Sequence, residues 1–93
     1  MNPDTTNYNL KIILIDDLRQ AFIQFNTYMD CYVHLKVMNE DDKEVRILLN
    51  ERLSEGIHNV PFNFGNLMGN YIIRLAVNTQ EAIDIENQTI QID

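Results

Sequence analysis

Apolar and polar residues alternate along most of this chain. Val33, Leu35 and Val37 are each followed by a residue that suits a half-exposed face, which is the period-two pattern of a strand with one buried face. The same alternation returns in segments 45–49, 57–62, 70–77 and 82–92. We therefore predict a β-strand in each of these segments.

The connections between these segments are short and polar. They occupy residues 39–43, 54–56, 63–66 and 78–80. Short polar connections favour antiparallel neighbours. Strands that recur about every 8 to 13 residues with polar turns between them are typical of a β-sandwich or a small barrel.

The first third of the chain fits two patterns. Apolar residues fall on one face of a helix over 17–29, namely Leu18, Ala21, Phe22, Phe25 and Met29, and this spacing suits an amphipathic helix. The same region also alternates with period two over 20–26, and the run Ile12–Ile15 is rich in β-branched residues, which favour strands. We predict strands at 10–16 and 20–26, and keep the helix as the alternative.

All these segments together predict about seven strands. A single open sheet would leave one apolar face in water, whereas two packed sheets bury every alternating face. We therefore predict an all-β protein, an Ig-like or fibronectin-like antiparallel β-sandwich over residues 10–93. Residues 1–9 are predicted to form a flexible N-terminal tail.

Length and charge limit the classes of protein. The chain has 93 residues, 14 of them acidic and 7 basic, with a formal net charge of −7. This length allows one domain, and the excess of negative charge argues against nucleic acid as a partner. No segment approaches the roughly 18 to 20 apolar residues of a membrane-spanning helix, so we predict no membrane span.

The first residues, 1–7, contain neither the basic patch nor the apolar run of a secretory signal. We expect a cytoplasmic protein if Met1 is the native start. We expect a secreted or cell-surface domain if the chain is a fragment of a larger exported protein.

Few side chains suit catalysis or metal binding. Cys31 is the single cysteine, so an internal disulfide cannot form, and the adjacent charge of Asp30 disfavours a reactive thiolate. His34 falls on the polar face of a predicted strand, His58 lies beside a turn, and nothing places Ser54 near either. We therefore predict no enzyme, no cofactor and no metal centre.

Carboxylates are concentrated in segment 39–44. Oxygen-rich loops can hold calcium, but no glycine occupies the sharp-turn position of an EF-hand loop. We interpret the segment as a solvated hairpin tip whose charges discourage stray pairing of strand edges. Asp41 and Asp42 are the candidates for contact with a partner protein.

The stretch from Leu53 to Leu75 is the most specific part of the sequence. It reads Leu53-x-x-Gly56-x-His58-x-Val60, followed by Leu67-x-Gly69-x-Tyr71-x-x-Arg74-Leu75. In this stretch Gly56 and Gly69 permit unusual backbone angles, and Tyr71 offers a ring to the core and a hydroxyl to a neighbouring loop.

This stretch resembles the C-terminal Ig-like domain that sorts cargo to the Bacteroidetes type IX secretion system, known as the type A sorting domain, and the related Ig-like domain of flagellar hook-capping proteins. The resemblance covers about residues 20–92. It implies a non-catalytic handle that the secretion machinery recognises and that a sortase-like protease often removes.

The chain departs from this family pattern in its hairpin, which has no glycine, in its last strand, which has no basic residue after Arg74, and in its start, which has no proline-containing opening segment of the family type. A sorting domain and a free-standing binding module therefore both stay open. In either case we expect a protein partner, or self-association through edge strands such as the last one, including a homodimer. The alternative is a small acidic inhibitor or immunity-like protein that binds a basic partner surface.

Overall fold

The computed structural model describes residues 7–15 and 19–93, and within these residues it contains strands but no helix. The seven strands are β1 (Lys11–Ile15), β2 (Gln20–Thr27), β3 (Cys31–Met38), β4 (Glu44–Leu53), β5 (Gly56–Asn63), β6 (Gly69–Asn78) and β7 (Ile83–Ile92). The predicted all-β class is confirmed. The alternative helix over 17–29 is wrong because residues 20–27 form β2, while Asp16 and Leu18 lie outside the described residues.

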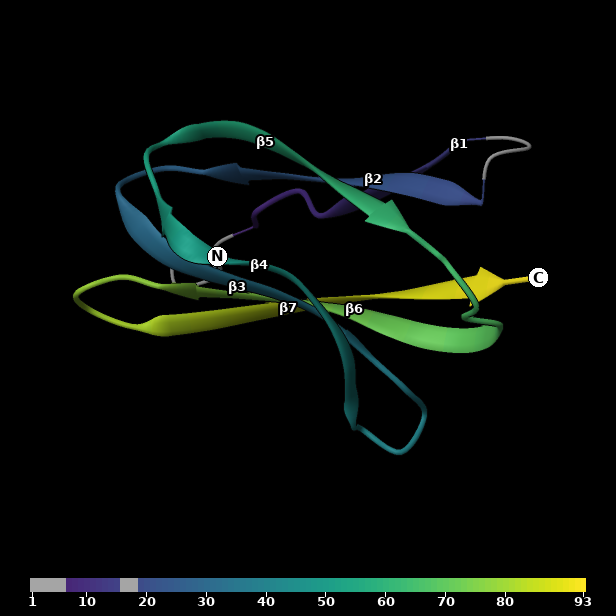
Figure 1. Cartoon of the computed structure of the whole chain (residues 1–93). Coiled ribbons are helices and arrows are strands. Elements are labelled where there is room, and N and C mark those ends of the chain that lie inside the picture. Colours follow the sequence, from purple (N-terminus) through teal and green to yellow (C-terminus); the bar gives the residue numbers. More distant parts are fainter. Residues whose placement is uncertain (1–6, 16–18) are drawn as a thin grey trace.

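The strands form two antiparallel sheets that pack face to face (Figure 1). One sheet has three strands in the order β1-β2-β5, and the other has four in the order β4-β3-β6-β7. The fourth strand pairs with the third instead of joining the first sheet, as expected for the fibronectin-like arrangement within the predicted class. The edge strands are β1, β5, β4 and β7.

The core lies between the sheets and is built mainly by the central strands. Every second residue of β2, β3 and β6 points inward, and Phe25, Leu35 and Leu75 have no exposed surface. The predicted inward positions Val33 and Val37 are also fully buried. Burying a large apolar side chain contributes about 1.5–3 kcal/mol, so these strands supply most of the driving force for closing the sandwich.

The inward face of β4 differs from the prediction. The alternation predicted Val45 and Ile47 on one face with Leu49, but Val45 is 37% exposed and Ile47 52% exposed. The pairing of β3 with β4 shifts register between Leu35 and Lys36 and again between Val37 and Met38. A bulge of this kind moves the following side chains to the other face of a strand.

The two isoleucines at the start of β7, which are its most visible apolar pair in the sequence, do not lie on its inward face. Ile83 and Ile85 are 68% and 57% exposed, whereas Ile90 and Ile92 are buried. The even-numbered residues point inward along the whole strand, since Glu86 lies directly opposite the buried Leu75. Carboxylates therefore occupy the inward face of one half of β7.

The predicted flexible tail over residues 1–9 is wrong for Tyr8, while residues 1–6 lie outside the described residues. This residue is only 4% exposed and belongs to the core. Its carbonyl accepts a hydrogen bond from the backbone of Asn26 at 2.7 Å, its backbone N–H donates to Glu86, and its hydroxyl donates to Asp84 at 2.6 Å. The packed domain therefore begins before residue 10.

Candidate functional site

The residues of the Leu53–Leu75 motif are spread through the fold instead of forming one site. Leu75 is fully buried and Val60 is 7% exposed, while Leu53, Leu67 and Tyr71 are half-buried against the core. The Tyr71 hydroxyl donates to the carbonyl of Met68 at 3.0 Å, which ties down the preceding loop as expected. These residues serve the architecture.

Gly56 and Gly69 both adopt positive φ, at 140° and 106°. A Cβ at either position would meet no atom within 4 Å. Backbone conformation, and not close packing, is therefore the reason for glycine at the start of β5 and of β6.

His58 lies on β5 and is half-buried against Phe25, with ring centroids 5.3 Å apart. Its Nε2 lies 3.0 Å from the Thr27 hydroxyl and 3.0 Å from the backbone carbonyl of Ser54. The Thr27 hydroxyl also donates to that carbonyl, at 2.9 Å. The ring therefore anchors the turn between β4 and β5.

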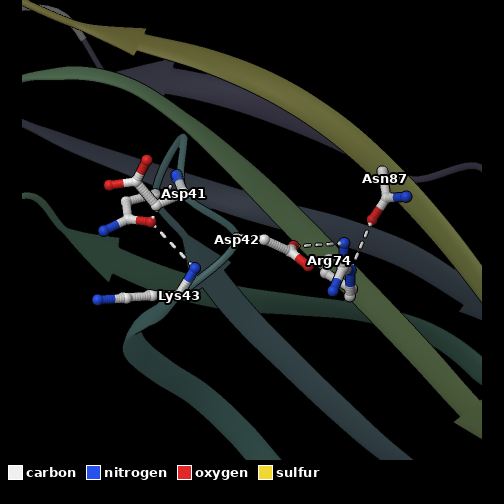
Figure 2. A network of polar contacts seen from close by, with 6 residues as sticks. Asp41, Asp42, Lys43, Arg74 and Asn87 are labelled. Atoms are coloured by element: carbon white, nitrogen blue, oxygen red, sulfur yellow. Dashed lines mark hydrogen bonds and ion pairs between the residues drawn. The ribbon is translucent and has the colours of Figure 1, made fainter.

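The acidic hairpin between β3 and β4 is held by contacts within the hairpin and by a contact with β6 (Figure 2). Asp42 adopts a positive φ of 63°, the position at which a turn without glycine often uses Asp or Asn. Its carboxylate pairs with Arg74 at 3.1 Å, and Arg74 donates to Asn87 at 3.1 Å. Asp41 makes no such pair within the described residues, and its backbone N–H donates to the side chain of Asn39 at 2.9 Å.

The two candidates for partner contact therefore differ. Asp41 presents an exposed carboxylate, whereas the carboxylate of Asp42 is already engaged. In the described residues no group of three or more His, Cys, Asp or Glu side chains is arranged to hold a metal ion.

A concave pocket of about 1060 Å³ lies at the other end of β3 from this hairpin. It is lined by residues of the turn between β2 and β3, of the loop between β6 and β7 and of the segment before β1. The first two of these connections lie at the left of Figure 1. We call it the tyrosine pocket. Its principal lining residues are Tyr8, Tyr28, Met29, Asp30, Cys31, Tyr32, Arg52, Glu81, Ala82 and Asp84.

The three tyrosine rings of the pocket are fixed by their hydroxyl groups. Tyr8 donates to Asp84, Tyr28 donates to the carbonyl of Asn7 at 2.8 Å, and Tyr32 donates to the carbonyl of Asn50 at 3.3 Å. The rings of Tyr8 and Tyr28 are tilted against each other at 6.0 Å. The aromatic walls are therefore formed before any ligand binds.

The loop opposite these rings is also ordered. The Thr79 backbone N–H donates to the carbonyl of Ala82 at 2.9 Å, and the Thr79 hydroxyl oxygen accepts from the backbone N–H groups of Glu81 and Ala82 at 3.3 and 3.2 Å. Short-range bonds of this kind hold a loop in one conformation. Glu81 is thereby placed on the rim of the pocket.

The charge of the pocket is negative. Asp30, Glu81 and Asp84 contribute carboxylates, and Arg52 is the one cation among the described residues that line the pocket. Burial, together with the hydrogen bond to Asp84, raises the pKa of Tyr8, so its phenol keeps its proton to a higher pH than an ordinary tyrosine does. Burial and the charge of Asp30 also raise the pKa of Cys31, so the thiol in the pocket wall is an unreactive apolar group.

The sequence patterns did not indicate this pocket. Its residues come from segments far apart along the chain, and each looks ordinary alone. One signal was present, because Tyr28 and Met29 place two large apolar side chains in a turn, where they are 52% and 55% exposed. Aromatic and methionine side chains exposed in a loop are typical of binding surfaces.

No protein-family model and no curated protein matches this sequence. In the part of the chain that the structure describes, no helix is long and apolar enough to cross a membrane.

Proposed function

We propose that this protein is a non-enzymatic interaction module that binds a basic segment of a partner protein in the tyrosine pocket. The observation that carries the proposal is the combination of two exposed tyrosine rings, Tyr28 and Tyr32, with a surplus of carboxylates among the described residues that line one concave surface. Loops at one end of a β-sandwich are a common place for recognition sites.

The aromatic rings provide the first part of the recognition. Tyr28 and Tyr32 present exposed ring surface to the pocket, at 52% and 36% exposure. An arginine or lysine side chain over such a ring gains about 0.5–1 kcal/mol at an exposed site. Because the rings are already held by hydrogen bonds, a ligand does not need to order them.

Charge provides the second part. The chain has a net charge of −7, and the pocket itself has more carboxylates than cations. A negative surface speeds the approach of a positive partner. Lysine and arginine side chains in a partner segment meet both requirements, whereas an acidic or nucleic acid partner would be repelled.

A tetra-arginine peptide tests the proposal by isothermal titration. We expect weak binding, with a Kd on the order of 0.1 to 1 mM, that weakens as salt is added. Tyr28→Ala is expected to weaken binding about two- to fivefold. A tetra-glutamate peptide is expected not to bind.

Two variants with the same loss of charge provide a matched control. Asp30→Asn removes a pocket carboxylate, and we expect about two- to fivefold weaker binding. Asp41→Asn removes an exposed carboxylate from the hairpin at the far end of β3, and we expect almost no change. Equal losses for the two variants, or no binding to the wild-type protein, would contradict the proposal.

A sorting role belongs to the same class of non-catalytic function. The resemblance of the Leu53–Leu75 stretch to the type A sorting domain supports it, and a handle of this kind needs a recognisable surface on a closed sandwich. Fusion of residues 7–93 to the C-terminus of an exported reporter in a Bacteroidetes host tests it. Release of the reporter supports a sorting signal, and retention in the periplasm counts against one.

As the alternative, this protein is a small acidic inhibitor that uses the same pocket. Its partner would then present a folded, basic active site instead of a flexible basic segment. A strong fall in association rate with ionic strength is expected for either use.

A further inference from the structure

We propose that the outer face of the three-stranded sheet is the surface through which two copies of this chain associate weakly. This inference is independent of the tyrosine pocket. The surface consists of the outward residues of β1, β2 and β5, and we call it the amide face. Its members are Lys11, Ile13, Ile15, Gln20, Phe22, Gln24, Asn26, Ile57, Asn59, Pro61 and Asn63.

The pairing register arranges these residues in rows across the sheet. Ile13, Phe22 and Pro61 lie directly opposite one another and form an apolar row over all three strands. Ile13 is 42% and Phe22 40% exposed. A continuous exposed apolar row on a sheet is a sign of an interaction surface.

Polar amides flank the apolar row on both sides. Gln20 and Asn63 are opposite each other on one side, and Gln24 and Asn59 on the other, where the Gln24 side chain donates to Asn59 at 3.0 Å. Each amide side chain carries both a donor and an acceptor. Such a surface can satisfy its hydrogen bonds against a copy of itself.

The amide face is free of negative charge in the described residues. The chain has 14 acidic residues, yet among the residues that the structure describes Lys11 carries the only charge on this face. In a two-fold symmetric dimer the same patch meets itself, so a charged patch repels its copy. Two molecules that each carry a net charge of −7 therefore approach with least repulsion at the amide face.

The edges of the sheets are less suited to self-association. β1 has 5 residues, β5 contains Pro61, β4 is bulged against β3, and β7 has the inward carboxylates Asp84 and Glu86. Short strands, proline, bulges and inward charges are the features that block pairing at a sheet edge. The expected association through edge strands is therefore less favoured than face-to-face association.

The size of the amide face sets the expected strength. Strands lie about 4.8 Å apart with about 3.3 Å per residue, and β2 has 8 residues, so each copy would cover on the order of 400 Å². The total of roughly 800 Å² is below the about 1,000 Å² that a stable interface usually exceeds, so it suits a weak, transient contact. We therefore expect a weak dimer, with a Kd on the order of 0.1 to 1 mM.

Sedimentation equilibrium at protein concentrations from about 10 µM to 1 mM tests this inference. The wild-type protein is expected to change from nearly all monomer to about half dimer or more over this range. Added salt is expected to strengthen the dimer because it screens the repulsion between like charges. Salt has the opposite effect on binding of a basic peptide, so the two proposals can fail separately. A monomer at all concentrations and salt conditions would overturn the dimer.

Charge-introducing variants locate the interface. Phe22→Glu is expected to keep the protein monomeric near 1 mM by placing facing carboxylates at the centre of the dimer. Ile85→Glu introduces the same charge on the outer face of the other sheet, at a residue that is 57% exposed, and is expected to dimerise like the wild type. If Phe22→Glu does not fold, Pro61→Glu, at an exposed edge-strand position, tests the same contact. Equal effects of the variants on the two faces would overturn the assignment.

Discussion

Tyr8 is a single residue that connects the two sheets. It lies in the segment before β1, its backbone bonds to β2, and its hydroxyl reaches Asp84 on β7. Asp84 points inward beside the core, so the phenol satisfies a carboxylate that would otherwise be poorly solvated. A half-buried charge without a donor costs more than an exposed one.

Tyr8→Phe is therefore expected to destabilise the fold. A hydrogen bond to a charged group contributes about 1.5–3 kcal/mol, and we expect the free energy of unfolding in urea at pH 7 to fall by about that amount. Tyr28→Phe removes an exposed hydroxyl whose acceptor is a backbone carbonyl, and should cost less than about 1 kcal/mol. Similar losses for the two variants would show that the Tyr8–Asp84 bond is unimportant.

Stability is also expected to depend on alkaline pH. The pKa values of Tyr8 and Cys31 are raised above their ordinary values of 10.0 and 9.0, so both groups hold their protons more tightly in the folded protein than in the unfolded chain. Their contribution is complete below about pH 9, and it is lost as the pH rises from there through the folded pKa values.

Urea unfolding at intervals from about pH 7 to 11 measures this dependence. Cys31→Ala is expected to delay the start of the decline from near pH 9 to near pH 10, since only the tyrosine then contributes. A free energy of unfolding that is constant up to pH 11 would contradict the assignment of these two groups.

At the scale of elements, the sequence was sufficient to locate the strands but not to orient all of them. Period-two alternation located β3, β5 and β6 and their inward residues because the pattern is uninterrupted there. In β4 two bulges change the face along the strand. In β7 the isoleucines occupy both faces, and the contact of Tyr8 with Asp84 and Glu86 decides between them.

The sequence patterns could not predict the tyrosine pocket either, because it too depends on contacts between elements. A pocket made by the segment before β1, a turn and a loop exists only after the strands have paired. Local periodicity gives no information about which connections meet at one end of a sandwich. The predicted candidates at Asp41 and Asp42 were instead chosen from a local concentration of charge.

The orientation of β7 can be tested with a pair of identical substitutions. Ile90 is 7% exposed and Ile83 is 68% exposed. Ile90→Ala is expected to lower the free energy of unfolding by about 2–4 kcal/mol, and Ile83→Ala by less than about 0.5 kcal/mol. A larger loss for Ile83→Ala would mean that β7 is shifted by one residue and faces the other way.

At the scale of the whole molecule, charge is distributed unevenly over a closed sandwich. Carboxylates are found at the acidic hairpin and around the tyrosine pocket, at opposite ends of β3, while the amide face has none among the described residues. This separation permits a weak dimer that leaves the pocket open. Two pockets on one dimer would then bind a repetitive basic partner more tightly than one pocket alone.

We propose that the tyrosine pocket is the surface with which this protein binds its partner. The most direct measurement is an NMR titration of the isotope-labelled protein with the tetra-arginine peptide, at a protein concentration low enough to keep it monomeric. We predict that the backbone amide signals of residues 28–32 and 79–84 shift and saturate together, while those of 39–44 remain in place. Shifts centred on the acidic hairpin, or small shifts spread evenly over all the acidic residues, would contradict the account.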